Sequence, residues 1–176
     1  LRPILVLAAA ESVGGERQTV LPFAVAAEFI HTYTLIHDDL PALDDDSLRR
    51  GKPTNHKVFG EAIAILAGDA LLTQAFVVMS NVVSMEGIPP ECILKASREM
   101  GEAISSVGVI GGQVVDLESK GQTVDTETLE YIHTCKTGFL FRACIRCGAI
   151  LSQASSSQLD GLSCLLVLSP SLQMLT

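Results

Sequence analysis

Residues 31–57 read HTYTLIHDDLPALDDDSLRRGKPTNHK, and this stretch decides how the rest of the chain is interpreted. Carboxylate oxygens suit Mg²⁺, which takes one or two carboxylates and leaves its other positions to water and phosphate. The planar guanidinium of arginine binds phosphate oxygens in a bidentate manner. The acidic and basic groups of this stretch therefore predict a metal-assisted diphosphate site, formed by Asp38, Asp39, Asp44, Asp45, Asp46, Arg49 and Arg50.

Pro41 decides how the aspartates can meet. The apolar residues before Asp38 predict a buried helix that runs into the aspartates. Asp44 lies six positions after Asp38, so an unbroken helix would turn their side chains apart. Because proline cannot continue a helix, Pro41 is expected to kink or stop it and to let Asp44 return toward Asp38. A solvated acidic turn is the alternative for a bare run of aspartates, and the proline and the arginine pair favour the metal site.

The segment LIHDDLPALDDDSLRRGKPTNHKVFGEAIAILAGDALL, residues 35–72, closely resembles the first aspartate-rich region of the trans-prenyltransferases. This family includes the farnesyl and geranylgeranyl diphosphate synthases of bacterial and plant type, and the resemblance extends from Leu1 to about Leu162. It implies an all-α bundle of the isoprenoid synthase type around a deep cavity. It also implies a reaction in which Mg²⁺ helps to ionise an allylic diphosphate, to which isopentenyl diphosphate then adds.

The resemblance assigns roles to residues outside the aspartate-rich stretch. Three of its elements are an arginine near the start of the chain, a Gly-Gln-x-x-Asp pattern and a Lys-Thr pair. It implies metal ligation and catalysis by Asp38, Asp39 and Asp44, with Lys136 as a further catalytic residue. It implies diphosphate binding by Arg2, His31, Arg49, Arg50, Gln113, Asp116, Lys136 and Thr137. Without the resemblance, each of the last four residues would be read as an ordinary helix-capping or surface residue.

Product length is expected to depend on the residues one helical turn before the aspartates. A growing prenyl chain would extend beside this helix, so Tyr33 and Thr34 are predicted to form the floor of the cavity. Thr34 is small, whereas the ring of Tyr33 is large and rigid. A bulky aromatic at this place resembles farnesyl synthases more than geranylgeranyl synthases, so a fifteen-carbon product is favoured over a twenty-carbon one.

Composition and charge limit the kinds of partner that the protein can bind. The chain has 176 residues, 48% of them hydrophobic, and a net charge of −8, so no basic stripe is available for nucleic acid. No uninterrupted apolar run has the ~20 residues of a membrane span, which predicts no transmembrane segment. Five cysteines at irregular spacing suggest a reducing compartment, and the expected location is the cytoplasm or a plastid.

Pro3 suits the start of a first helix, and four further helical segments are expected along the chain. They span residues 20–36, residues 61–79, a stretch from Pro90 to Ser119, and a stretch that begins near Thr126 and carries Lys136. Glycines at 108, 111 and 112 in the third of these predict a bend or a close helix approach. Asp69, within the second, is expected to be a paired buried acid.

The family pattern stops after residue 162. Residues 1–162 are therefore interpreted as the N-terminal part of a prenyltransferase domain, and residues 163–176 as a divergent tail that Pro170 would keep from being helical. The second aspartate-rich motif of the family does not occur in these 176 residues, so the bundle is expected to be incomplete and this chain inactive alone.

Two function classes remain from the sequence. The chain is either the catalytic half of a short-chain prenyltransferase or a non-catalytic or truncated subunit that pairs with a full-length synthase. A homodimer or a heterodimer is expected in either case. A terpene cyclase also uses aspartate-rich sites, but the matches at Arg2, His31 and Arg50 to an isopentenyl diphosphate site argue against it.

Overall fold

The computed structural model describes residues 1–81 and 86–167. In this part of the chain every element but one short hairpin is helical, which confirms the all-α prediction. In chain order the elements are α1 (Arg2–Ser12), α2 (Arg17–Asp38), β1 (Leu48–Arg49), β2 (Lys52–Pro53), α3 (Asn55–Phe59), α4 (Glu61–Met79), α5 (Pro90–Ile104), α6 (Val109–Ser119), α7 (Thr126–His133), a π-helical turn (Thr134–Gly138), α8 (Phe139–Leu151) and α9 (Ser156–Val167).

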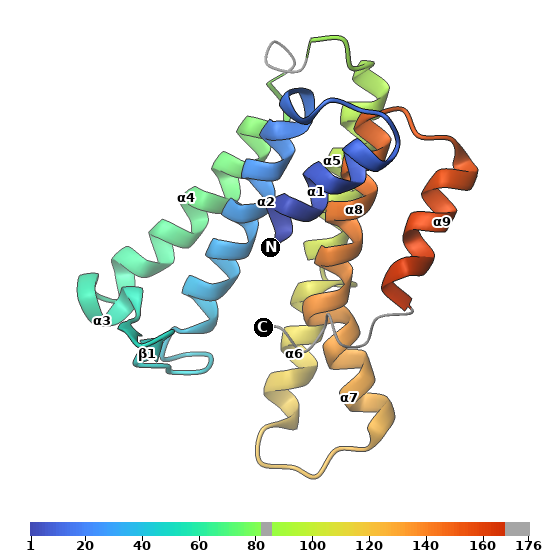
Figure 1. Ribbon diagram of the computed structural model, residues 1–176. Helices are drawn as coiled ribbons and strands as arrows, with labels where there is room; N and C mark the ends of the chain where they lie inside the picture. The colour runs from blue at the N-terminus through green and yellow to red at the C-terminus, as the bar shows by residue number, and fades with distance from the viewer. Residues whose placement is uncertain (82–85, 168–176) are drawn as a thin grey trace.

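The core lies where α1, α2, α5 and α8 meet (Figure 1). Phe23 and Ile30 of α2 and Leu140 and Leu151 of α8 are among its buried side chains. Helix α4 packs along α2 on one flank of this core, and α9 packs on α8 on the opposite flank. The burial of these apolar side chains is the main force that holds the helices together.

Gly148 brings α1 and α8 into close contact. A β-carbon at this position would overlap the carbonyl oxygen of Val6 in α1, and it would also come within 3.2 Å of the backbone nitrogen of Ala10. Glycine is therefore the residue that permits this spacing. The contact fixes α1, and with it Arg2, against the core.

The stretch from Pro90 to Ser119 forms two helices, so the prediction of one helix is wrong. Helix α5 ends at Ile104, and α6 begins at Val109 after a turn at Ser105–Gly108. A β-carbon on Gly108 would overlap the carbonyl oxygen of Ala103, so glycine permits this tight turn. A β-carbon on Gly112 would lie 2.7 Å from the backbone nitrogen of Lys136, and this confirms the predicted close helix approach.

Helix α7 and helix α8 form one rod that the π-helical turn interrupts. The turn inserts one extra residue into the helix, a distortion that often marks functional sites. Lys136 and Thr137 lie in it, and the side chain of Asp125 caps the start of the rod by accepting a hydrogen bond from the backbone N–H of Thr128.

Two helices of the described chain, α2 and α4, meet the length and composition of a membrane span. In the most apolar 18-residue stretch of each helix, 44% of the residues of α2 and 22% of those of α4 are buried inside the structure. This is weak support for a span, because helices packed into a protein core pass the same test. The predicted tail begins within α9, which passes through residue 162 without a break, and the predicted helix break at Pro170 lies outside the described residues.

Candidate active site

The aspartate loop begins where α2 ends, at Asp38, three residues before Pro41. The backbone N–H of Asp44 donates to the carbonyl of Asp38 at 2.9 Å, and that of Asp45 donates to Leu40 at 3.1 Å. These bonds fold the loop back onto the end of α2. The predicted effect of Pro41 is confirmed, since the helix stops and Asp44 returns to Asp38.

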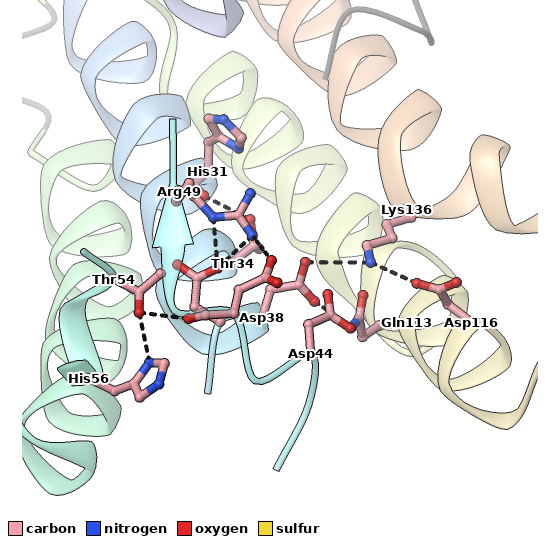
Figure 2. A network of polar contacts seen from close by, with 12 residues as sticks. His31, Thr34, Asp38, Asp44, Arg49, Thr54, His56, Gln113, Asp116 and Lys136 are labelled. Atoms are coloured by element: carbon pink, nitrogen blue, oxygen red, sulfur yellow. Dashed lines mark hydrogen bonds and ion pairs between the residues drawn. The ribbon is translucent and has the colours of Figure 1, made fainter. Parts of the chain in front are cut away.

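Asp38 lies at the centre of a polar network (Figure 2). Gln113 of α6 donates a hydrogen bond to Asp38, and Lys136 Nζ lies 3.5 Å from Asp38 and 2.8 Å from Asp116. Burial raises the pKa of Asp38, Lys136 opposes that rise, and the nearby carboxylate of Asp44 adds to it. The network therefore joins three elements that are far apart in the sequence.

Asp44 has a second cation as its partner. The ammonium of Lys120, just beyond the end of α6, donates to Asp44 Oδ1 at 2.7 Å and to the carbonyl of Leu43 at 2.9 Å. Partial burial acts to raise the pKa of Asp44, but the contacts with Lys120 and Lys136 outweigh it and lower this pKa. Sequence reasoning missed Lys120, because a lysine after a helix end, 76 positions from its partner, gives no local signal.

Asp39 is held by Arg49. Its side chain is 5% exposed, and Arg49 donates to its Oδ1 from Nε at 2.7 Å and from Nη2 at 2.6 Å. The hydrogen bond to Asp39 is the main reason that the pKa of Arg49 is raised. Metal ligation by Asp39 stays a prediction.

Arg2, His31 and Arg50 form a positively charged corner beside the aspartates. Arg2 is 6% exposed, its guanidinium stacks 4.7 Å from the ring centroid of Phe141, and its Nε has no hydrogen-bond partner. Burial, followed by the charges of Arg2 and Arg50, lowers the pKa of His31 to about 3. His31 is therefore neutral near pH 7 in the free chain, and one ring nitrogen can donate a hydrogen bond while the other can accept one.

A cavity of about 690 Å³ lies between α2, α4 and α6, within the usual range for small-molecule sites. Its polar end carries the aspartates and the cations, whereas leucine, valine and isoleucine side chains line much of the rest. The predicted site residues that line it are Arg2, His31, Tyr33, Thr34, Asp38, Asp44, Arg49, Gln113, Lys136 and Thr137. Asp39, Arg50 and Asp116 do not line the cavity. Asp39 contacts the lining residue Arg49, and Asp116 contacts the lining residue Lys136.

The donor set fits Mg²⁺. Among the described residues, no cluster of three or more His, Cys, Asp or Glu side chains is arranged as a complete metal site. Mg²⁺ does not need one, because it commonly binds one or two carboxylates and fills its remaining positions with water and substrate phosphates. The paired carboxylates of Asp38 and Asp44, open to the cavity, suit that mode.

Asp69 differs from its prediction. Its side chain is 60% exposed and lies 3.9 Å from Nε2 of His37, so it is not a buried acid. The reason is that Asp69 lines the cavity beside His37 rather than the packed contact between α4 and α2. His37 instead makes its closer contact, 3.0 Å, with the carbonyl of Ile65.

A helical bundle with aspartates and cations at the mouth of a partly apolar cavity defines the isoprenoid synthase class of folds. The profile of the family described as Polyprenyl synthetase matches residues 1–167. The chain belongs to this family.

Relatives agree with this assignment. A dimethylallyltranstransferase of Fischerella ambigua is 51% identical over 93% of this chain, which covers 47% of that protein. A farnesyl diphosphate synthase of Geobacillus stearothermophilus is 47% identical over 90% of this chain, which covers 53% of that protein. The large subunit 1 of a heterodimeric chloroplastic geranylgeranyl pyrophosphate synthase of Arabidopsis thaliana is 48% identical over 92% of this chain, which covers 44% of that protein. The chain thus spans about half the length of these relatives.

A solved structure confirms the fold. The FPP/GFPP synthase of Zymomonas mobilis superposes with a TM-score of 0.88 at 39% identity, over 94% of this chain and 59% of its own.

Proposed function

We propose that this chain carries the diphosphate-binding part of a short-chain prenyltransferase that joins isopentenyl diphosphate to an allylic diphosphate. One observation carries the proposal: Asp38 and Asp44 meet Lys136 at the polar end of a cavity whose lining continues as apolar side chains. A molecule with a diphosphate head and a hydrocarbon tail matches that distribution of charge. Farnesyl and geranylgeranyl diphosphate synthases among the relatives support the same substrate class.

Two groups of side chains would each bind one of the two diphosphates. Asp38 and Asp44 would hold Mg²⁺, which when bound supplies Lewis-acid stabilisation to a departing diphosphate. Lys136, Thr137 and Gln113 face the same place and would donate hydrogen bonds to the oxygens of the allylic diphosphate as charge develops on them.

The positively charged corner would hold isopentenyl diphosphate. The buried Nε of Arg2 lacks a partner, and a diphosphate oxygen would satisfy it. His31, which is neutral, would contribute a hydrogen bond, and Arg49 and Arg50 would add charge-assisted ones. The apolar residues of the cavity would enclose the prenyl tails and exclude water from the carbocation.

Calorimetry with inorganic pyrophosphate tests the allylic diphosphate site. The 176-residue chain should bind pyrophosphate more tightly with Mg²⁺ than without it, because the metal offsets the repulsion from Asp38 and Asp44. Lys136→Gln should weaken binding by at least about tenfold, the factor expected for a charge-assisted hydrogen bond.

Lys95→Gln is the matched control, since Lys95 is an exposed lysine on α5. Equal affinities for the Lys136→Gln and Lys95→Gln variants would remove Lys136 from the site. Affinity unchanged by Mg²⁺ would refute the paired-aspartate metal site.

The second candidate is a subunit that pairs with another prenyltransferase chain. The observation in its favour is the outer face of α4, where Ile63, Leu66 and Val77 are 53%, 61% and 53% exposed. Such an apolar face on one helix is typical of an interaction surface. One relative is by its name the large subunit of a heterodimer. We propose that α4 pairs either with a second copy of this chain or with a full-length synthase.

Light scattering measures this pairing. Leu66→Lys should convert a dimer into monomers or weaken it at least about tenfold, because burying an unpaired ammonium is costly. Leu94→Lys is the control, since Leu94 is 71% exposed on α5, away from the face in question. If both variants associate as the unchanged chain does, alone and with a full-length synthase, α4 is not the interface.

Tyr33 and Thr34 are proposed to set the length of the product. Tyr33 is 7% exposed and packs edge-on against His37, with ring centroids 5.8 Å apart, and both Tyr33 and Thr34 line the cavity. Tyr33→Ala, made in a form that condenses the substrates, should shift the products toward chains longer than fifteen carbons because it removes the bulk of the floor. Separation of the products by chain length measures the shift. Val25→Ala is the control, since Val25 is 38% exposed on the same helix and does not line the cavity. An unchanged distribution in Tyr33→Ala would place the stop elsewhere.

The proposed compartment is the cytoplasm or a plastid, given bacterial relatives and relatives whose names include a chloroplast location. A fluorescent fusion of the complete gene product would decide between the two.

A further inference from the structure

The hairpin that carries the two arginines is too short to hold its own position. Strands β1 and β2 have two residues each, and they pair Leu48 with Pro53 and Arg49 with Lys52. Its turn, at Arg50 and Gly51, has φ angles of 53° and 78°. Even a longer two-stranded hairpin is only marginally stable by itself in water. Other contacts must therefore fix Arg49.

Thr54 supplies the contacts that close the base of the hairpin (Figure 2). It is 3% exposed and follows β2 directly. Its hydroxyl donates to the carbonyl of Asp46 at 2.7 Å, and its backbone N–H donates to the carbonyl of Ser47 at 3.1 Å. Thr54 thus ties the exit of the hairpin to the two residues before its entry.

The hydroxyl bond of Thr54 is connected to the cavity through Asp46 and Arg49. The carboxylate of Asp46 lies 3.6 Å from Nη2 of Arg49, the side chain that Asp39 also holds and that lines the cavity. A shift of the Asp46 backbone would move one of the two carboxylates that orient the guanidinium. Within residues 1–81 and 86–167, the hydrogen bonds of the Thr54 side chain go to Asp46 and His56, neither of which is a predicted ligand-binding residue. We therefore expect any effect of Thr54 on the ligand to pass through Arg49.

His56 fixes the orientation of the Thr54 hydroxyl. That hydroxyl has one hydrogen, and the short bond to Asp46 uses it. His56 Nδ1, 3.2 Å from Thr54 Oγ1, must therefore carry the hydrogen of the second bond and act as the donor. The ring is 7% exposed, and its Nε2 has no hydrogen-bond partner and lies 3.9 Å from Asp45 Oδ1. The closer contact, with Thr54 at 3.2 Å, is therefore the one that orients this histidine.

We propose that Thr54 and His56 form a positioning pair, the Thr54–His56 latch, which holds Arg49 in the orientation that binds a diphosphate. The identity of the ligand rests on the function proposed above, whereas the orientation of Arg49 is a property of the free chain. The two can therefore be tested separately.

Substitutions at Thr54 distinguish the hydroxyl from the shape of the side chain. Thr54→Val keeps the volume and loses the donor, and Thr54→Ser keeps the donor. In ¹⁵N-labelled free chain, the Arg49 Nε–H donates to Asp39, so it exchanges with solvent when the hairpin opens. Thr54→Val should raise this exchange rate about tenfold, because the lost bond to Asp46 opposes that opening by the free energy of about one hydrogen bond. Thr54→Ser should stay within about twofold of the unchanged chain, since its hydroxyl still donates. Exchange that is equally slow in all three proteins would overturn the latch.

Affinity for inorganic pyrophosphate with Mg²⁺ should follow the same order. Thr54→Val should weaken it about tenfold, and Thr54→Ser should not. In an Arg49→Lys background Thr54→Val should have no further effect, because the side chain through which it acts has been replaced. A loss of the same size in that background would contradict positioning through Arg49.

Two variants at His56 test the same latch without changing Thr54, in case a substitution at Thr54 disturbs folding. His56→Asn places an amide donor near Nδ1 and should keep the slow exchange of Arg49, whereas His56→Gln places its donor near Nε2 and should not. Similar exchange rates in these two variants would count against the latch. If the unchanged chain binds no pyrophosphate, the proposed function fails, and the exchange rates of Arg49 still decide whether the latch exists.

Discussion

Asp38→Ala should reduce condensation by at least about a hundredfold in any form of the protein that joins the two diphosphates, because a preorganised charge at the reacting group is worth about 10²–10³ in rate. Asp38 is the residue that Gln113, Lys136 and Asp44 all approach, so its loss removes both a proposed metal ligand and the partner of two substrate-binding side chains. Turnover measured with labelled isopentenyl diphosphate gives the comparison.

Stability should not fall with activity in this variant. Burial raises the pKa of Asp38, which means that the folded protein holds this carboxylate in an environment unfavourable to its charge. Asp38→Ala should therefore leave helix content and the unfolding midpoint close to those of the unchanged protein. Loss of rate without loss of fold is the signature of a residue kept for function.

Asp45→Asn is the control. Its carboxylate is 61% exposed, and asparagine tolerates the left-handed φ of 52° at this position. This variant should keep its rate within a few-fold. Near-normal turnover in Asp38→Ala, or an equal loss in Asp45→Asn, would refute the assignment of the metal site.

The second large effect concerns folding. Gly148→Ala should lower the free energy of unfolding by about 2–3 kcal/mol, because its methyl group would overlap the backbone of α1, and backbone cannot move aside as a flexible side chain can. Urea unfolding followed by circular dichroism measures the loss.

Gly101→Ala should have the opposite sign. Gly101 is also within a helix, α5, but a β-carbon there meets nothing within 4 Å. Alanine favours the helix over glycine by about 1 kcal/mol, so this variant should gain stability by up to that amount. Equal effects at the two glycines would mean that helix propensity, rather than the α1–α8 contact, governs position 148.

The sequence predicts local features well where one residue type dominates the physics. Pro41 stops α2, and the apolar run of α4 begins at Glu61 and ends at Met79 as predicted. The long stretch from Pro90 was misjudged because its apolar pattern continues through the turn, and only the backbone overlap at Gly108 reveals the tight turn there.

Contacts between distant segments were beyond reach of the sequence. The pairing of Asp39 with Arg49 joins an aspartate that the resemblance places among the metal ligands to a predicted diphosphate-binding arginine. The bond between Lys120 and Asp44 joins residues whose separation gives no pattern to read. Both depend on how the aspartate loop folds back after α2 stops, where backbone hydrogen bonds to Asp38 and Leu40 position Asp44 and Asp45.

The π-helical turn at Thr134–Gly138 lies between α7 and α8, and it allows the side chains before it and after it to be oriented independently. Each residue of an α-helix advances by about 100°, so the one extra residue rotates everything beyond it by that angle relative to a continuous helix. Lys136 faces the aspartates, and the buried face of α8 packs on α1 and α5. The directions of these two sets of side chains around the helix axis are therefore not fixed to each other by the regular α-helical repeat. Lys136 and the core residues of α8 can each be oriented as their own contacts require, within one uninterrupted backbone.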